Sequence, residues 1–215
     1  MTAQNETLFD PVHDTQLFYR ELLDAFAEPG TVKTTRRLTA GAAELAPGSR
    51  LAAVIALTLL DSEVRFAVEL EDKERLSAFI RMHTFARSAE PAGADYIFAD
   101  GRTAPPAWAD AVGVGTLAEP EHGATVFLLV DDLAEAAESE AAPAAEGIRL
   151  TLTGPGVPGE RTLAVAGLRA EWLARRAVWN AEYPLGADAV LFTVSGKLAA
   201  LPRTTRAASK SDQGG

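Results

Sequence analysis

The run at residues 124–130 most constrains the fold, because it is apolar along almost its whole length. It is long enough for a strand and short for an ordinary helix. A strand without a polar face must be covered on both sides, as happens in parallel sheets with layers packed on each face. The run therefore predicts the central strand of an α/β sheet.

Helical and extended patterns alternate along the first half of the chain. Residues 14–28 repeat apolar positions at helical spacing and stop at Pro29-Gly30, whereas 63–70 alternate with a period of two. We expect further strands at 31–38 (a sheet edge), 95–99, 147–153, 189–194 and 198–201. We expect further helices at 49–60, with Ser49 as its N-cap, at 105–112 and at 168–180. Another helix is expected to begin after Asp72 as its N-cap, with Leu76, Phe79, Ile80 and His83 on one side. This order predicts a three-layer α/β/α fold around a mixed sheet.

The chain is expected to form a single domain over residues 8–206. Within it, residues 131–146 are acidic and alanine-rich and hold no basic or aromatic residue. This composition predicts a flexible, solvated linker that is partly helical. Residues 207–215 are small and polar and are expected to form a disordered tail.

Composition excludes several classes of function. The chain has no cysteine, so disulfides, thiolate zinc sites, iron–sulfur clusters and cysteine nucleophiles are excluded. Thirty acidic against 20 basic residues give a net charge of −10, which makes nucleic acid and anionic membrane poor partners. The longest apolar stretch, 51–60, is too short to cross a bilayer, and the first residues lack the apolar segment of a secretory signal. We therefore expect a cytoplasmic protein.

Gly154-Pro155-Gly156-Val157-Pro158-Gly159 has the spacing of a dinucleotide-binding motif. Such a motif needs backbone N–H groups and a helix after the last glycine. The two prolines each remove an N–H, and the residues that follow alternate like a strand. A rigid turn is the favoured interpretation, although Arg161 leaves open an anion held by one guanidinium.

Familiar catalytic and metal-binding patterns are missing from the sequence. The three histidines, His13, His83 and His122, are widely separated and form no metal-binding motif, so no metal is expected. There is neither a G-x-S-x-G nucleophile elbow nor a phosphate-binding loop. None of the four lysines has the apolar flanks typical of a Schiff-base lysine.

Candidate contact residues lie at the ends of the expected elements. Arg81 and Thr84 are three positions apart at the end of a helix, beside His83, and could hold an anion or a partner's carboxylate. Ordinary helix C-terminal chemistry is the alternative. Glu119 precedes the central strand in a segment that reads either as a solvated acidic turn or as a functional loop. Arg203 and Thr204 could clamp a phosphate or a partner, or simply end the last strand.

Several short segments occur in an order that resembles a known family. They are Phe18-Tyr19-Arg20-Glu21-Leu22-Leu23, Glu28-Pro29-Gly30, Arg81-Met82-His83-Thr84, and residues 115–125, 152–156, 183–188 and 201–205. Together they resemble the PhnH subunit family of the bacterial carbon–phosphorus lyase core complex. The resemblance runs from about residue 8 to 206, and the chain departs from it in the acidic stretch and the polar tail.

The resemblance implies a role in phosphonate catabolism. With its sister subunits, the family supports transfer of methylphosphonate onto the ribose C1 of a nucleoside triphosphate, which gives α-D-ribose 1-methylphosphonate 5-triphosphate. It also implies a fold similar to pyridoxal-phosphate-dependent transferases but without the cofactor, a homodimer when isolated, and assembly with other core subunits. The absence of cysteine agrees, since the iron–sulfur subunit that breaks the carbon–phosphorus bond cannot lack it.

Two hypotheses follow. In the first, the chain is a subunit that is not catalytic alone, needs no cofactor of its own, and uses its surfaces to assemble the complex. In the second, it is a stand-alone binder or enzyme for a phosphorylated small molecule, with Arg81, His83, Arg161 or Arg203 on the anion.

Overall fold

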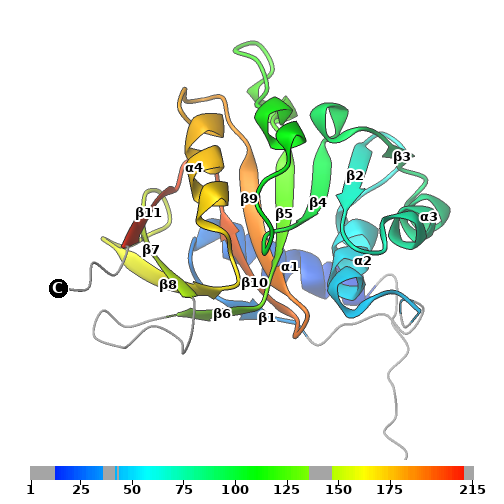
Figure 1. Ribbon diagram of the computed structural model, residues 1–215, viewed down its shortest axis with the longest axis horizontal. Coiled ribbons are helices and arrows are strands. Elements are labelled where there is room, and N and C mark those ends of the chain that lie inside the picture. The colour runs from blue at the N-terminus through cyan, green and yellow to red at the C-terminus, as the bar shows by residue number, and fades with distance from the viewer. Residues whose placement is uncertain (1–12, 36–41, 43, 136–146, 211–215) are drawn as a thin grey trace, which may run out of the picture.

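The computed structural model describes residues 13–35, 42, 44–135 and 147–210 (Figure 1). Its main sheet has seven strands in the order β1-β10-β9-β5-β4-β2-β3. Strands β3, β2, β4, β5 and β9 run parallel, and β10 and β1 continue the sheet antiparallel. The strands are β1 (Lys33–Thr34), β2 (Arg65–Glu69), β3 (Arg87–Ser88), β4 (Tyr96–Asp100), β5 (Thr125–Val130), β9 (Asp188–Thr193) and β10 (Lys197–Leu201).

Strand β5 lies at the centre of the sheet, between β4 and β9. All its residues after Thr125 are buried. Phe127 and Leu129 pack into the core on one face, whereas Val126 and Leu128 pack into the core on the other. The prediction of a central strand is confirmed, and both faces need a covering layer.

Three helices cover one face of the sheet (Figure 1). Phe18 of the first and Leu51 of the second are buried against Phe127 and its neighbours, and Leu76 of the third extends the same core. The helices are α1 (His13–Ala27), α2 (Pro47–Leu59) and α3 (Lys73–Thr84). Among the described residues, no helix is both long and apolar enough to cross a membrane.

The other face is covered by one helix, short 3₁₀ turns and a second sheet (Figure 1). Trp172 and Trp179 of α4 pack here beside Leu133, Leu150 and other side chains of the small sheet. The elements are α4 (Ala170–Trp179), the 3₁₀ helix η3 (Ala107–Ala111), and the antiparallel sheet β11-β7-β8-β6, with β6 (Asp132–Glu135), β7 (Gly147–Thr153), β8 (Arg161–Ala166) and β11 (Arg206–Lys210). The mixed α/β architecture with a mixed sheet is thus confirmed, but this outer layer is part sheet.

The order of the parallel strands defines a special point at their carboxyl ends. The chain visits them as β2, β3, β4, β5 and β9, but they lie side by side as β3-β2-β4-β5-β9. This is the doubly wound order 2-1-3-4-5, in which the chain first moves outward and then returns to the far side of its first strand. Open α/β sheets bind ligands where that reversal occurs, which here is between the carboxyl ends of β2 and β4.

Two expected helix caps have a different role. Ala46, not Ser49, is the N-cap of α2, and Ser49 lies buried in the first turn. Asp72 stands at the N-cap of α3 but makes no side-chain cap there. Its carboxylate instead accepts the Ala46 N–H at 2.8 Å and a hydrogen bond from the Ser49 hydroxyl. Asp72 therefore caps α2 although it lies more than 20 residues after the start of that helix, so the contact is not visible in the local sequence.

Other expectations need correction at their boundaries. The edge strand holds only Lys33–Thr34 among the described residues, and the helix expected at 105–112 is the 3₁₀ helix η3. The acidic linker expectation fails for Asp132–Glu135, which form β6 paired with β8, while residues 136–146 lie outside the described residues. The tail expectation fails for 207–210, which belong to β11 on β7, and 211–215 lie outside the described residues. In both cases, pairing with a distant strand supplies the hydrogen bonds that local sequence does not show.

A buried arginine joins α4 to the turn between the two sheets. Arg176 is 6% exposed, and its Nη2 donates to the backbone carbonyls of Leu201, Pro202 and Thr205. Burial lowers the pKa of its guanidinium to about 10, so it stays charged at neutral pH. The three carbonyls take the place of water around this charge.

Replacing this side chain tests its structural role. Arg176→Met keeps the apolar stem but leaves the three carbonyls without their donor, so we expect a loss of about 2–4 kcal/mol in the free energy of unfolding. Urea denaturation measures the loss. The matched control is Arg175→Met, which removes a partly exposed partner of Asp110 and should cost about 0.5 kcal/mol. Equal losses in the two variants would refute the assignment.

Candidate functional site

A cleft of about 220 Å³ opens at the carboxyl ends of the parallel strands. Leu70 and Glu71 follow β2, Asp100 ends β4 with Arg102 just beyond it, and Leu129 belongs to β5. The remaining lining residues are Ala46, Pro47, Gly48, Ser49 and Val194. This carboxyl-edge cleft therefore coincides with the reversal point between β2 and β4, where a doubly wound sheet binds its ligand.

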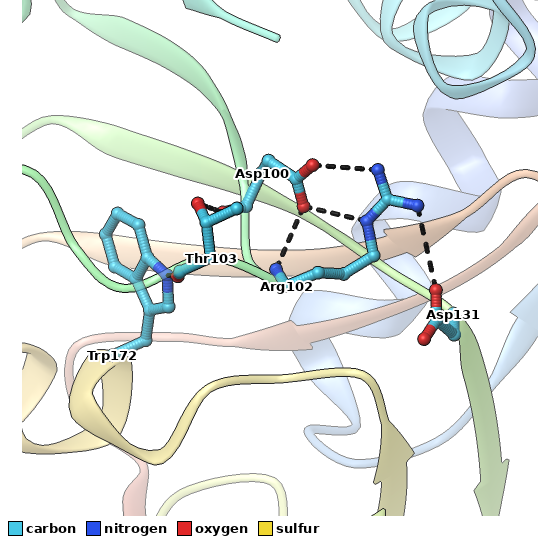
Figure 2. Close-up of polar contacts among 5 residues, drawn as sticks. All are labelled: Asp100, Arg102, Thr103, Asp131 and Trp172. Carbon is cyan, nitrogen blue, oxygen red and sulfur yellow. Dashed lines mark hydrogen bonds and ion pairs between the residues drawn. The ribbon is translucent and has the colours of Figure 1, made fainter. Parts of the chain in front are cut away.

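The turn after β4 presents an arginine at the cleft (Figure 2). Asp100 Oδ1 accepts the Arg102 backbone N–H at 2.9 Å and its Nε–H at 2.8 Å, and Oδ2 accepts from Nη2 at 2.7 Å. Arg102 Nη1 lies 3.7 Å from a carboxylate oxygen of Asp131, which follows β5. The first pair is bidentate and fixes the guanidinium plane, whereas the second is a longer ion pair.

The surrounding elements hold this turn in place. The Gly101 N–H donates to the carbonyl of Leu129, and the Gly101 carbonyl accepts from the Arg169 N–H, both at 2.9 Å. The Trp172 indole donates to the Thr103 carbonyl at 2.9 Å, as Figure 2 shows. Thr103 in turn donates its hydroxyl to the Asp100 carbonyl. Anchors from β5 and α4 therefore position Arg102 before any ligand arrives.

Electrostatics keep both members of the Asp100–Arg102 pair ionised. Burial by itself would raise the pKa of Asp100, but hydrogen bonds from Arg102 outweigh it and hold that pKa below its usual range. The hydrogen bonds to Asp100, aided by the charges of Asp100 and Asp131, raise the pKa of Arg102.

One wall of the carboxyl-edge cleft is the first turn of α2. Gly48 approaches β5 so closely that a Cβ there would come within 2.6 Å of the Leu129 side chain. The absence of a side chain at Gly48 thus lets the helix reach the strand end.

A second cleft, of about 330 Å³, lies at the opposite end of the sheet, where the same strands begin. Tyr96 starts β4, Thr125 starts β5 and Asp188 starts β9. The full lining is Glu63, Val64, Asp95, Tyr96, Glu121, His122, Gly123, Thr125, Asp188 and Arg203. Burial, with the nearby charge of Asp95, raises the pKa of Tyr96, so its hydroxyl stays protonated at neutral pH. We refer to it as the amino-edge cleft.

Of the residues predicted from the sequence, Arg203 lines the amino-edge cleft, and Glu119 and Thr204 lie close to it in the chain. Arg203 donates to the Pro120 carbonyl at 2.6 Å and pairs with Asp188 at 3.1 Å. Glu119 lies 3.8 Å from His122, a lining residue, whereas Thr204 is exposed in the turn after β10. Arg203 thereby ties the loop before β5 to the start of β9.

The remaining predicted residues lie elsewhere. Arg161 donates to the carbonyls of Glu28 and Pro29, so it fastens the end of α1. Thr84 donates to the Ile80 carbonyl, and His83 Nδ1 lies 2.8 Å from the Phe79 carbonyl. Arg81 and His83 are exposed on the last turn of α3, where Thr84 is buried. None of these four residues lines either cleft.

The glycine-proline motif lies in the turn of a hairpin. Its residues 154–159 connect β7 to β8, which pair antiparallel, so no helix follows the last glycine. A Cβ at Gly156 would lie 2.2 Å from the Ala27 carbonyl oxygen. Gly156 thus lets the turn pack closely against the end of α1, which agrees with the rigid-turn interpretation. Across the described ranges, no group of three His, Asp or Glu side chains could hold a metal ion.

Sequence reasoning missed the carboxyl-edge residues Asp100, Arg102 and Asp131. A signal was present, since Asp100 and Asp131 directly follow the two expected strands 95–99 and 124–130. Carboxyl ends of parallel strands meet at one edge of a sheet, so acids at two such ends converge.

The Asp100–Arg102 pair should make stability depend on pH. Because the pKa of Asp100 is lower in the folded chain, the pair stabilises above the usual Asp pKa and is lost as pH falls through the folded value. We expect Asp100→Asn to lower the free energy of unfolding by about 1 kcal/mol at pH 7, since Arg102 is partly screened by solvent. Urea denaturation should show this difference shrinking below about pH 4. A difference constant from pH 7 to pH 3 would contradict the ion-pair assignment.

Comparison with known proteins adds a family to this geometry. Residues 6–208 match the family described as bacterial phosphonate metabolism protein (PhnH). A putative C-P lyase subunit protein HtxG of Stutzerimonas stutzeri is 36% identical over 192 residues, which cover 88% of this chain and 84% of that protein. The alpha-D-ribose 1-methylphosphonate 5-triphosphate synthase subunit PhnH of Rhizobium meliloti (strain 1021) is 31% identical over 212 residues, or 96% and 98% of the two chains. The chain therefore belongs to the PhnH family of bacterial phosphonate metabolism proteins.

Proposed function

We propose that the chain is a subunit of a carbon–phosphorus lyase core complex and supports formation of α-D-ribose 1-methylphosphonate 5-triphosphate from a nucleoside triphosphate and methylphosphonate. The observation that carries this proposal is the match of nearly the whole chain to relatives named as subunits of such complexes. Each relative is matched over most of its own length, so the similarity is not confined to one segment.

The chain is not catalytic alone in this proposal. The conspicuous arginines serve the fold: Arg161, Arg176 and Arg203 donate to backbone carbonyls. The three lysines with described side chains are each paired with a carboxylate: Lys33 with Glu28, Lys73 with Glu69, and Lys197 with Asp132. A lysine held by a carboxylate lacks the apolar surroundings that activate a Schiff-base lysine, which supports a role without pyridoxal phosphate. The fold is proposed to be similar to that of the transferases that use this cofactor.

The exposed end of α3 is the proposed contact with other subunits. Arg81 and His83 stand there beside Met82 and Phe85, whose side chains are 72% and 74% exposed. Large apolar side chains next to an arginine are typical of protein interfaces. Thr204 and Glu119 are proposed as further contacts at the amino edge of the sheet. The chain is also proposed to be cytoplasmic. When isolated, it is proposed to form a homodimer, which light scattering on the purified protein would test.

Copurification tests the subunit assignment. The tagged full-length chain, expressed with the other gene products of its phosphonate pathway, should retain them through a salt wash. The purified assembly should release free base from a nucleoside triphosphate only when methylphosphonate is present. The same preparation made without this chain, and the chain by itself, should each lose at least tenfold in rate. Full turnover by the lone chain, or no loss when it is omitted, would refute the assignment.

The alternative is a stand-alone binder or enzyme for a phosphorylated small molecule. Its supporting observation is the carboxyl-edge cleft, which has an ordered arginine. Full pathway flux in cells whose chain no longer joins the other subunits would favour this alternative.

A further inference from the structure

One edge of the Arg102 guanidinium makes only a long ion pair. A guanidinium carries five N–H groups, and Asp100 takes the Nε–H and one Nη2–H. The opposite edge is formed by Nη1 and the second Nη2–H, and its partner among the described residues is Asp131, which lies 3.7 Å from Nη1. That distance is too long for a hydrogen bond. Within the described ranges, this edge therefore retains capacity for a second bidentate acceptor.

The setting of this edge distinguishes Arg102 from the arginines that support the fold. Arg161, Arg176 and Arg203 bind carbonyls of distant segments. Among the described residues, Arg102 makes its short side-chain hydrogen bonds to Asp100 of its own turn, with Asp131 as a longer ion pair. Its side chain stays 38% exposed at the carboxyl-edge cleft. The turn is itself fixed by Trp172 and Leu129, so the guanidinium has little freedom left to lose on binding.

We propose that Arg102 is the receptor of an oxyanion site in the carboxyl-edge cleft, and that it binds a phosphoryl or phosphonyl group through its free edge. Asp100 is a positioning residue that orients the guanidinium, and the ligand replaces Asp131 at Nη1. Two oxygens of a tetrahedral oxyanion match the two parallel N–H groups. The cleft, at about 220 Å³, is below the usual size for drug-like ligands and suits a small one.

The neighbouring carboxylates set the strength of this site. Asp100 is neutralised by its bonds to Arg102, but Asp131, 59% exposed, competes with any anion for Nη1. Glu71 adds a further negative charge on the lining. Affinity is therefore modest, and removing the charge of Asp131 strengthens binding. This gain on substitution is a signature that a purely structural ion pair would not give.

Calorimetric titration of the full-length chain tests the site with three probes: inorganic phosphate, methylphosphonate and ribose 5-phosphate. Arg102→Gln should weaken binding at least tenfold, and Asp131→Asn should tighten it about threefold. The matched control is Arg65→Gln, which removes a similar Arg–Asp pair (with Asp95, at 3.4 Å) near the other end of β4 and should change affinity less than twofold. Similar affinity for all three probes would show that the site recognises the oxyanion alone. A higher affinity for ribose 5-phosphate would show that the site also contacts the sugar. Either pattern supports the proposal.

The proposal is overturned if the unaltered chain binds none of the probes, or if Arg102→Gln binds them as well as the unaltered chain. Should Arg102→Gln fail to fold, the gain in Asp131→Asn decides, since an unchanged affinity there also overturns it. The oxyanion site depends on the proposed function only for the choice of methylphosphonate as a probe. Copurification with other subunits does not depend on Arg102, so failure of one proposal leaves the other standing.

Discussion

The burial of β5 on both faces is the constraint on which the rest of the structure depends. Every residue of β5 after Thr125 is buried in an apolar core, so the strand needs a layer on each side. On one face, Phe127 and Leu129 pack in the core that α1, α2 and α3 cover. On the other face, Val126 and Leu128 pack in the core that α4 and the small sheet cover. Neighbouring β4 and β9 then complete the backbone hydrogen bonds that a buried strand cannot leave unmade.

This arrangement also determines where chemistry can be placed. Side chains inside the sheet are used for packing, so polar groups that meet a ligand have to lie at the strand ends. The carboxyl ends hold an ordered guanidinium and two carboxylates, and the amino ends hold a tyrosine, a histidine and the Arg203–Asp188 pair. The two clefts are therefore separated by the length of the strands, and a ligand at one edge need not disturb a partner at the other.

Arginine has two roles in this chain, and its partners distinguish them. Arg176 and Arg161 donate to carbonyls at segment ends, where loops would otherwise leave acceptors without donors. Arg102 is held by a carboxylate next to it in sequence, which orders the side chain without using all of its donors. All three residues are arginines, so their different roles come from their surroundings.

Local pattern determined much of the fold, because period and length report directly on burial. The central strand at 124–130, the helix at 14–28 and the strands at 189–194 and 198–201 were all predictable from side-chain spacing alone. Composition also excluded cysteine chemistry, and ordered short segments indicated the PhnH family. Tertiary structure alone decided that Asp72 caps α2, that Arg161 fastens α1, and that the Arg102 guanidinium lies between Asp100 and Asp131. The physical reason is that these contacts join residues brought together by strand order and packing, and spacing along the chain carries no information about that order.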